Sequence, residues 1–459
     1  MVKSVSVAAG KAARVAVPLA SHAEVGVRND RDPVGLLLEQ AKTRVPALVP
    51  LRHGRMLVSP FAYFRGAALP MAADVAQLPD SGIRVQLCGD AHLANFGVYA
   101  SPERQLVFDL NDFDETLPGP FEWDVKRLAA SLAVAGRGRG FSRKVRREII
   151  ISTVEEYRSA MRGFADERTL AVWYTHLYIE DSLKEFSSQI TDKRVKSIYL
   201  QLAKARTRDS AHASSKLTAV VNGQRRIMSN PPLIEPIEDV LSDLDVDALY
   251  GMLRGLLARY RRSLTSERRH LFDQFTLVHA ARKVVGVGSV GTRAWILLMV
   301  GPDGIEPLML QAKEAQPSVL TAYAGGSTYL NQGQRVVAGQ RLMQASSDIF
   351  LGWQRTRGVD GIDRDYYLRQ LRDWKASPEI ERMIPATMAA YGRLCGWTLA
   401  RAHARSGDRV AIAAYLGRSR DFDHAIADFS ETYADLNERD YAALQAAVAS
   451  GRIQAITGL

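Results

Sequence analysis

Residues 89–95, with the sequence GDAHLAN, carry a carboxylate, an imidazole and a carboxamide in one short segment. A carboxylate can position a hydroxyl group and take its proton, while a nearby amide oxygen can ligate magnesium. We therefore take Asp90 as the candidate base and Asn95 as a candidate metal ligand. His92 is expected to position the loop from within the site, because no second histidine lies at metal-ligand spacing.

A cluster of acidic residues follows the apolar residues 106–108 and offers further metal ligands. Magnesium prefers carboxylate oxygens, and a bridging carboxylate would hold it against the phosphates of a nucleotide. We favour Asp112 for this role, because the DFD sequence that it begins looks like the Asp-Phe-Gly metal motif, and we place Asp109 second. At least one of Asp109, Asn111 and Asp114 is expected to belong to a polar turn instead.

Residues 286–291, with the sequence GVGSVG, have the glycine spacing of a phosphate-binding loop. The spacing alone is weak evidence, and a dinucleotide-binding loop requires a helix directly after its glycines. Here the branched and aromatic residues 292–300 end at a turn sequence, 301–304, which predicts a β-hairpin. Glycines in such a turn let backbone amides approach a triphosphate, and a lysine near the end of the third strand would pair with the phosphates. The residues assigned to this binding are Gly286, Gly288, Ser289, Gly291 and Lys313. The alternative is a plain hairpin with a surface lysine.

The elements that must position these residues follow from the spacing of apolar side chains. Strand patterns cover residues 84–87, 276–287, 292–300, 306–313, 349–354 and 365–371, with a hairpin near 100–103. Helical spacing covers most of 123–262, which prolines interrupt at 231, 232 and 236, and also 332–347 and 384–459.

This order predicts four parts. Residues 1–35 form a mobile amino-terminal arm, and residues 36–265 hold the catalytic-loop and metal-binding segment together with a helical lobe. Residues 266–378 form a sheet lobe with the glycine loop and the lysine, and residues 379–459 are helices that complete the helical lobe.

The composition narrows the class of protein and its partners. The chain has 459 residues, of which 47% are hydrophobic and 24% charged, as in globular proteins. Its two cysteines, Cys88 and Cys395, are too few for a disulfide framework, which favours a reducing cytoplasm. No apolar run approaches about 18 residues, so we expect no membrane partner. The formal charge of +10 suits an anionic nucleotide. It comes without a nucleic-acid recognition motif, so nucleic acid is not an expected partner.

Several motifs together resemble a bacterial family, domain-of-unknown-function family 2252. They are residues 88–97 (CGDAHLANFG), 108–116, 123–128 (WDVKRL), 333–337 (GQRVV) and 399–405 (LARAHAR). The resemblance extends from about residue 35 to the end of the chain. Within it, the Gly-Asp-x4-Asn pattern is similar to the protein-kinase-like superfamily that includes aminoglycoside and choline kinases.

The resemblance implies an α+β, circularly permuted protein-kinase-like fold: a small antiparallel-sheet lobe with one inserted helix, plus a larger, mainly helical lobe. Kinases place the glycine loop and lysine before the catalytic Asp, whereas this chain has the reverse order. The helix at 386–404 resembles the one that precedes the catalytic loop in those kinases. An Asp at position 124 braces that loop in related kinases, although Asp124 could also cap its own helix.

One kinase feature is missing. The lysine normally pairs with a Glu on the following helix, but residues 332–347 contain none. Gln340, Gln344, Asp348 and Glu314 are nearby in sequence, and the partner of Lys313 stays open.

The resulting hypothesis is an ATP- and Mg²⁺-dependent phosphotransferase that acts on an unknown hydroxyl acceptor, a small molecule rather than a protein. The alternatives are transfer of AMP on the same fold, a nucleotide-binding regulator without catalysis, and a nucleic-acid binder. The hypothesis requires Lys313 within about 15 Å of Asp109 or Asp112, because a bound triphosphate and its metal span no further.

Overall fold

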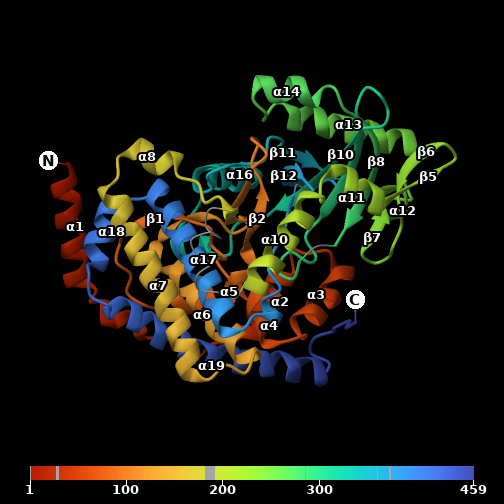
Figure 1. The fold of residues 1–459 in the computed structure, drawn as a ribbon. Coiled ribbons are helices and arrows are strands. Elements are labelled where there is room, and N and C mark those ends of the chain that lie inside the picture. The colour runs from red at the N-terminus through yellow and green to blue at the C-terminus, as the bar shows by residue number, and fades with distance from the viewer. Residues whose placement is uncertain are drawn as a thin grey trace.

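A six-stranded antiparallel sheet and a larger group of helices form the two main parts of the chain (Figure 1). The computed structural model describes residues 2–26, 30–180, 192–284, 286–358, 360–371 and 374–458. The chain is therefore α+β, with small antiparallel sheets, as the sequence predicts. Of the helices in these ranges, none has the length and apolar character needed to cross a membrane.

The main sheet has the strand order β11-β12-β10-β9-β8-β7. Its strands are β7 (Ile234–Pro236), β8 (Thr276–Lys283), β9 (Ala294–Val300), β10 (Pro307–Ala315), β11 (Gly352–Arg357) and β12 (Asp363–Gln370). The predicted strands β8, β9 and β10 are confirmed as consecutive antiparallel neighbours, and a turn closed by the Gly301 amide and the Glu306 carbonyl (2.9 Å) joins the last two. Strand β11 begins three residues after its predicted start, because Asp348 accepts from the Phe350 amide (2.8 Å) and holds a turn there.

Both faces of the sheet are covered, which explains the continuous apolar run in β9. Alternate residues of a strand point to opposite faces. Leu297 and Met299 pack with helix α13 (Val246–Arg261), whereas Ile296 and Leu298 pack with helix α11 (Ser210–Leu217). Strand β7 and helix α13 precede residue 266 and belong to the sheet and its cover, whereas α14 (Ser266–Phe272) begins at that residue.

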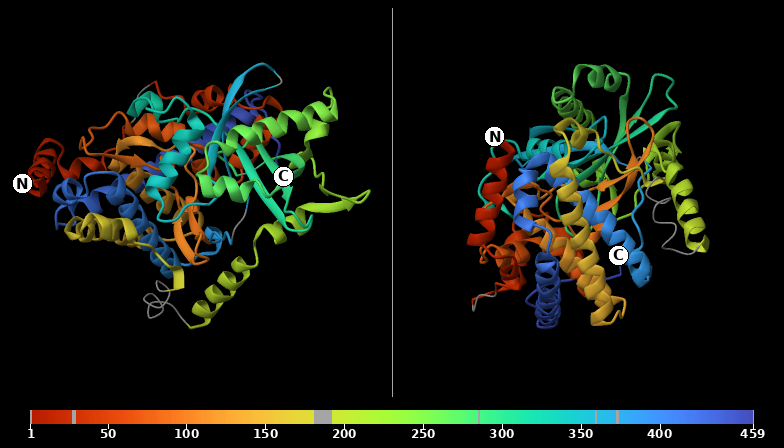
Figure 2. Two further views of the ribbon diagram at one scale, coloured as in Figure 1. Left: turned by 90° about the horizontal axis from the view of Figure 1, so that it is seen from above. Right: turned by 60° about the vertical axis from the view of Figure 1, so that its left-hand side comes forward.

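The region from 123 to 262 is less helical than predicted. Helices α6 (Phe121–Gly138), α7 (Arg143–Asp166), α8 (Thr169–Tyr174) and α10 (Asp192–Arg206) are followed by a hairpin of β5 (Thr218–Val221) and β6 (Gln224–Ile227), and then by β7 and α12 (Ile237–Val240). The hairpin turns at Asn222 and Gly223, both with positive φ, which ends helical spacing there. The left view of Figure 2 shows α10 and this hairpin, in yellow-green, projecting from the body.

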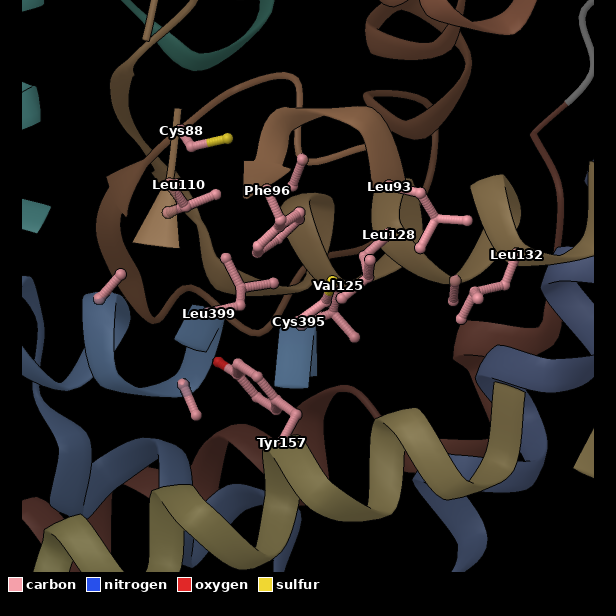
Figure 3. Close-up of a cluster of buried hydrophobic side chains, with 14 of the residues drawn as sticks. Cys88, Leu93, Phe96, Leu110, Val125, Leu128, Leu132, Tyr157, Cys395 and Leu399 are labelled. Atoms are coloured by element: carbon pink, nitrogen blue, oxygen red, sulfur yellow. The ribbon is translucent and has the colours of Figure 1, made fainter. Parts of the chain in front are cut away.

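The helical part is built from helices of the first half of the chain and helices near its carboxyl end. It contains α6 and α7 together with α17 (Pro385–Ser406), α18 (Arg409–Leu416) and α19 (Asp421–Ala449). Glycines let α17 approach α7 closely: a Cβ at Gly396 would lie 2.4 Å from the Thr153 carbonyl oxygen. The shared core beneath the segment that carries Asp90 includes Leu128, Tyr157 and Leu399 (Figure 3).

The first residues are not a mobile arm, which corrects the sequence prediction. Helix α1 (Val2–Ala16) lies against α18, and Arg14 donates to the Ala414 carbonyl (2.6 Å). A Cβ at Gly10 would lie 2.2 Å from the Ala411 carbonyl oxygen. The contact is made by small residues rather than large apolar ones, so apolar spacing does not reveal it. Helix α2 (Pro33–Ala41) follows, and residues 27–29 lie outside the described residues.

The remaining helices and strands lie in residues 49–120 and 321–343. They are α3 (Val49–Met56), α4 (Pro60–Gly66), α5 (Ala68–Val75), β1 (Arg84–Leu87), β2 (Phe96–Ala100), β3 (Leu106–Leu110), β4 (Leu117–Pro120), α15 (Thr321–Ala324) and α16 (Gln332–Met343). The predicted hairpin near 100–103 is the antiparallel pair β2–β3.

Candidate active site

The loop that carries Asp90 is held by helix α6. The Asp124 carboxylate accepts from the Cys88 amide (2.7 Å) and the Gly89 amide (3.0 Å). His403 lies 3.3 Å from the same carboxylate, and Tyr157 contacts the other ring nitrogen of His403 (2.8 Å). Asp124 therefore braces the loop, as the resemblance implies, and the helix begins three residues earlier without using it as a cap.

Asp90 lies at the end of this loop with its two carboxylate oxygens in different surroundings. Arg127 donates through Nε to Oδ1 (2.8 Å), and Oδ2 lies 3.6 Å from His92 Nε2. Arg127 is fixed in turn by the Phe64 carbonyl (2.6 Å). Burial raises the pKa of Asp90 to about 6, against the opposing attraction of Arg127. The carboxylate is thus ionised at neutral pH and close to the range of a general base.

His92 and Asn95 flank this carboxylate. His92 is buried, and burial lowers its pKa well below the usual value, so its imidazole is neutral. Its Nδ1 has no hydrogen-bond partner among the described residues. Asn95 donates from Nδ2 to the Asp90 carbonyl (2.7 Å), which leaves Oδ1 as the atom able to ligate a metal.

The two candidate metal-binding aspartates differ sharply in their surroundings. Asp109 is 1% exposed, forms a buried ion pair with Arg401 (2.6 and 2.8 Å) and accepts from the Ala345 amide (3.0 Å). It ties β3 to α17 and to the end of α16. The side chain of Asp112 is 31% exposed and lies 3.7 Å from Lys313 Nζ. The second choice of Asp109 as metal ligand is therefore corrected to a structural role, because its carboxylate is already engaged in the core.

Lys313 pairs with residues 109–114, which we call the acidic segment, rather than with a helix. Its amino group contacts Asp114, which also accepts from Tyr367 (2.7 Å) and Ser289 (3.2 Å). Burial alone would lower the pKa of Lys313, but the attraction of Asp112 and Asp114 outweighs burial and raises it. The sequence left this partner open, and the structure assigns it to Asp114.

Helix α16 contacts the acidic segment through an arginine in place of the expected Glu. Arg335 donates to the carbonyls of Thr116 (2.6 Å), Asp114 (2.8 Å) and Gln316 (2.9 Å). The other sequence candidates have different partners. Gln340 and Gln344 bond to each other (3.0 Å), Glu314 pairs with Arg293 (3.3 Å), and Asp348 accepts from the Phe350 and Gln370 amides.

The glycine loop is a turn between β8 and β9. As predicted, the described residues 286–300 contain no helix, and the loop runs directly into β9. Gly286 and Gly291 have positive φ (68° and 91°), a conformation that favours glycine. Arg55 donates to the Gly286 carbonyl (2.6 Å), and a Cβ at Gly288 would lie 3.3 Å from the Arg65 carbonyl oxygen. The segment with α3 and α4 therefore supports the loop from outside.

Two adjoining cavities lie between the glycine loop and the acidic segment. The first, the Asp90 cavity, has a volume of about 340 Å³ and is lined by Asp90, His92, Asn95, Asp112, Asp114, Gly286, Gly288 and Ser289, among others. The second, the basic cavity, has a volume of about 630 Å³. Eight basic residues line it: Arg65, Lys204, Arg208, Lys216, Lys283, Lys313, Arg369 and Lys375. Both cavities are lined by Arg65, Asn95, Asp112, Gly286 and Ser289.

The structure thus brings together most of the residues singled out from the sequence. Gly291 lines neither cavity and packs on Arg44 instead. Sequence reasoning missed Arg65, Arg127 and the pairing role of Asp114. Arg127 had a usable signal, because it lies one helical turn after Asp124 and shares its face of α6.

A further carboxyl group in the Asp90 cavity is Glu115, whose pKa burial raises to about 7. In the part of the chain that the structure describes, no three His, Cys, Asp or Glu side chains group as a complete metal site.

The chain matches the model of one bacterial protein family. The family model described as "Uncharacterized protein conserved in bacteria (DUF2252)" matches residues 44–447, and the chain belongs to this family. No curated protein and no solved structure matches the chain.

Proposed function

We propose that this member of the bacterial family is an ATP- and Mg²⁺-dependent phosphotransferase that acts on a hydroxyl group of a small molecule. The observation that carries the proposal is the meeting of two sequence motifs at adjoining cavities. The Lys313–Asp114 contact joins them across 199 positions of the chain, and Asp112 lies 3.7 Å from the same amino group. This distance is well inside the roughly 15 Å that a nucleotide and its metal can span.

The arrangement of elements supports a circularly permuted kinase-like fold. Strands β8, β9 and β10 form a meander with the glycine loop in its first turn, and α16 is inserted after the third strand, as in a kinase amino-terminal lobe. The end of α17 lies beside β1, where the Gln86 amide donates to Ser406 Oγ (3.2 Å). A kinase chain of ordinary order would run directly from this helix into the catalytic loop. Here α17 continues into α18 and β1 follows α5, but the end of α17 and β1 stay in contact.

The residues present fit a magnesium ion. Asn95 and Asp112 both line the two cavities and offer an amide and a carboxylate oxygen. Magnesium is usually bound by one or two protein carboxylates with substrate phosphates and water as the other ligands, so a complete protein cage is not needed. When bound, the ion supplies neutralisation of the charge that develops on the phosphates.

Residues of the chain itself bind the phosphates and activate the acceptor. Lys313 exchanges its carboxylate partners for phosphate oxygens, and the backbone of residues 286–289 covers the phosphates. Asp90 holds the acceptor hydroxyl in the Asp90 cavity and takes its proton at Oδ2, because Arg127 occupies Oδ1. The neutral His92, whose Nε2 lies 3.6 Å from that oxygen, does not compete for it as a cation.

Labelled ATP tests the proposal. With Mg²⁺ and a panel of hydroxylated small molecules, label from the γ-phosphate should appear in a product, or in inorganic phosphate when water is the acceptor. Label from the α-phosphate in a product would instead identify AMP transfer. Binding of Mg-ATP without turnover of either label would identify a non-catalytic regulator. The variant Lys313→Ala should lose the transfer, whereas Lys11→Ala, on the exposed face of α1, should keep it.

A further inference from the structure

The basic cavity differs from a pocket built for a nucleoside. Of the described residues that line it, only Ala94 and Leu371 are apolar apart from glycine, none is Phe, Tyr or Trp, and His212 is the single aromatic ring. Pockets for flat organic ligands are lined mainly by apolar and aromatic side chains. Here the lining contains eight lysines and arginines and one carboxylate, Asp112, while Asp114 pairs with Lys313 from the adjoining cavity.

The polar character reaches the floor of the cavity on strand β10. Gln311 and Lys313 point to the same face because alternate residues share a side of the strand, and both line the cavity. The next residue on this face, Met309, is buried in a cluster with Ala213 of α11. Helix α11 therefore covers the apolar part of the sheet face, and only the polar part remains open to a ligand.

The cations form two groups along the cavity. Lys313 and Arg369 lie on neighbouring strands, and Arg369 donates to the Gln311 side chain (3.4 Å) and the Asn111 carbonyl (3.1 Å). A second group comes from outside the sheet. Lys204 lies in the last turn of α10 and Lys216 in the last turn of α11, and Arg208 between the two helices donates to the Lys375 carbonyl (3.3 Å). A triphosphate held at Lys313 and the glycine loop would leave this outer group facing the rest of the ligand.

We propose that the basic cavity recognises a linear chain of phosphates along its length and has no slot for a nucleobase. ATP would then bind through its triphosphate, and inorganic polyphosphate would compete for the same cavity. The inference rests on the proposed function only in assigning this cavity to the phosphate donor. The spread of positive charge is the physical basis, because each added phosphate meets another cation in a partly enclosed site.

Calorimetry with Mg²⁺ separates phosphate recognition from base recognition. The ligands are adenosine, AMP, ADP, ATP, GTP, inorganic tripolyphosphate and a longer polyphosphate. Affinity should rise with the number of phosphates, and tripolyphosphate should compete with ATP. A preference for ATP over tripolyphosphate of more than about fivefold, the smallest gain expected from stacking a base, would overturn the inference. A single-stranded oligonucleotide that competes as well as polyphosphate would also overturn it.

A pair of variants with equal charge change locates the site. Lys204→Ala with Lys216→Ala should weaken the longer polyphosphate at least tenfold while leaving AMP unchanged. Lys11→Ala with Lys144→Ala removes two exposed lysines outside the cavity and should change neither affinity. Equal losses in both double variants would show a general charge effect and exclude the cavity.

The two proposals fail separately. If tripolyphosphate binds as expected but no label moves from ATP, the phosphotransferase proposal falls and the ligand class stands. If label moves from ATP but affinity depends on the nucleobase rather than on the number of phosphates, only the proposal of a phosphate-chain ligand is wrong.

Discussion

Lys313 on β10 and Asp114 in the acidic segment form an ion pair that connects the sheet to the acidic segment. Ser289 of the glycine loop and Tyr367 of β12 donate to the same carboxylate. One carboxylate thus holds the lysine, the glycine loop and the neighbouring strand. A phosphate that takes Lys313 must compete with this carboxylate.

Replacing Lys313 should therefore affect nucleotide binding first. In Lys313→Ala we expect Mg-ATP to bind roughly 10- to 100-fold more weakly, the loss expected for one charge-assisted hydrogen bond. Lys313→Arg keeps the charge and should retain part of the affinity. Calorimetry measures both, and equal affinities in Lys313→Ala and the unaltered protein would show that Lys313 does not touch the nucleotide.

Asp90 and Asp112 should separate chemistry from binding. Asp90→Asn should lower turnover by roughly 10²- to 10⁴-fold with Mg-ATP affinity nearly unchanged, because it acts on the proton of the acceptor. Asp112→Asn should weaken Mg-ATP as well, because it removes a metal ligand. If neither variant changes binding or turnover, the acidic segment has a structural role only and the phosphotransferase proposal is wrong.

Turnover should depend on pH through Asp90. Its pKa of about 6 means that the base is protonated below pH 6, so the rate should rise with pH up to that value and level off above it. Arg127 opposes the effect of burial, so Arg127→Gln should move this limb to higher pH. Arg143→Gln, an exposed arginine on α7, is the matched control and should leave the limb in place.

Glu115 provides the second control for the pH profile, because it titrates near pH 7 in the same cavity. The limb near pH 6 should persist in Glu115→Gln. Its disappearance there would assign the titration to Glu115 and remove Asp90 as the base.

Asp109 and Arg401 should control stability rather than metal binding. Arg401→Met leaves Asp109 buried without its cation, which should cost about 3–5 kcal/mol of unfolding free energy in urea denaturation. Asp109→Asn should lower the melting temperature without changing the Mg²⁺ dependence of ATP binding. The surface variant Arg143→Met should stay within about 0.5 kcal/mol of the unaltered protein. A Mg²⁺ defect in Asp109→Asn would restore Asp109 as a metal ligand.

Sequence reasoning selects the residues of the candidate site more readily than the residues that support them. Runs of branched and aromatic residues and the turn at 301–304 identified β8, β9 and β10, because both faces of these strands are buried in apolar clusters. Asp90, Asn95 and Asp112 could be selected from residue type and close spacing, and the structure places all three at the Asp90 cavity. Arg65 was not, because nothing local distinguishes an arginine that lines two cavities from one on a surface.

Long-range pairing and contacts between small residues were beyond sequence reasoning. Asp109 and Asp112 carry equal chemistry in sequence, and only the position of Arg401 on a distant helix separates them. Helix α1 was taken for a mobile arm because its contact with α18 uses Gly10 and short side chains rather than an apolar stripe.

The position of α17 beside α7 and β1 has a consequence for synthesis on the ribosome. The segment that carries Asp90, α6 and α7 leave the ribosome early, but the helix that completes their core is made only after the whole sheet has been translated. Domains generally fold from the amino terminus as they emerge, and contacts between distant parts of a chain form slowly. The apolar faces of α6 and α7 therefore stay exposed to solvent until α17 has been synthesised. We expect nascent chains that stop before residue 385 to bind chaperones, and release to follow once α17 is available.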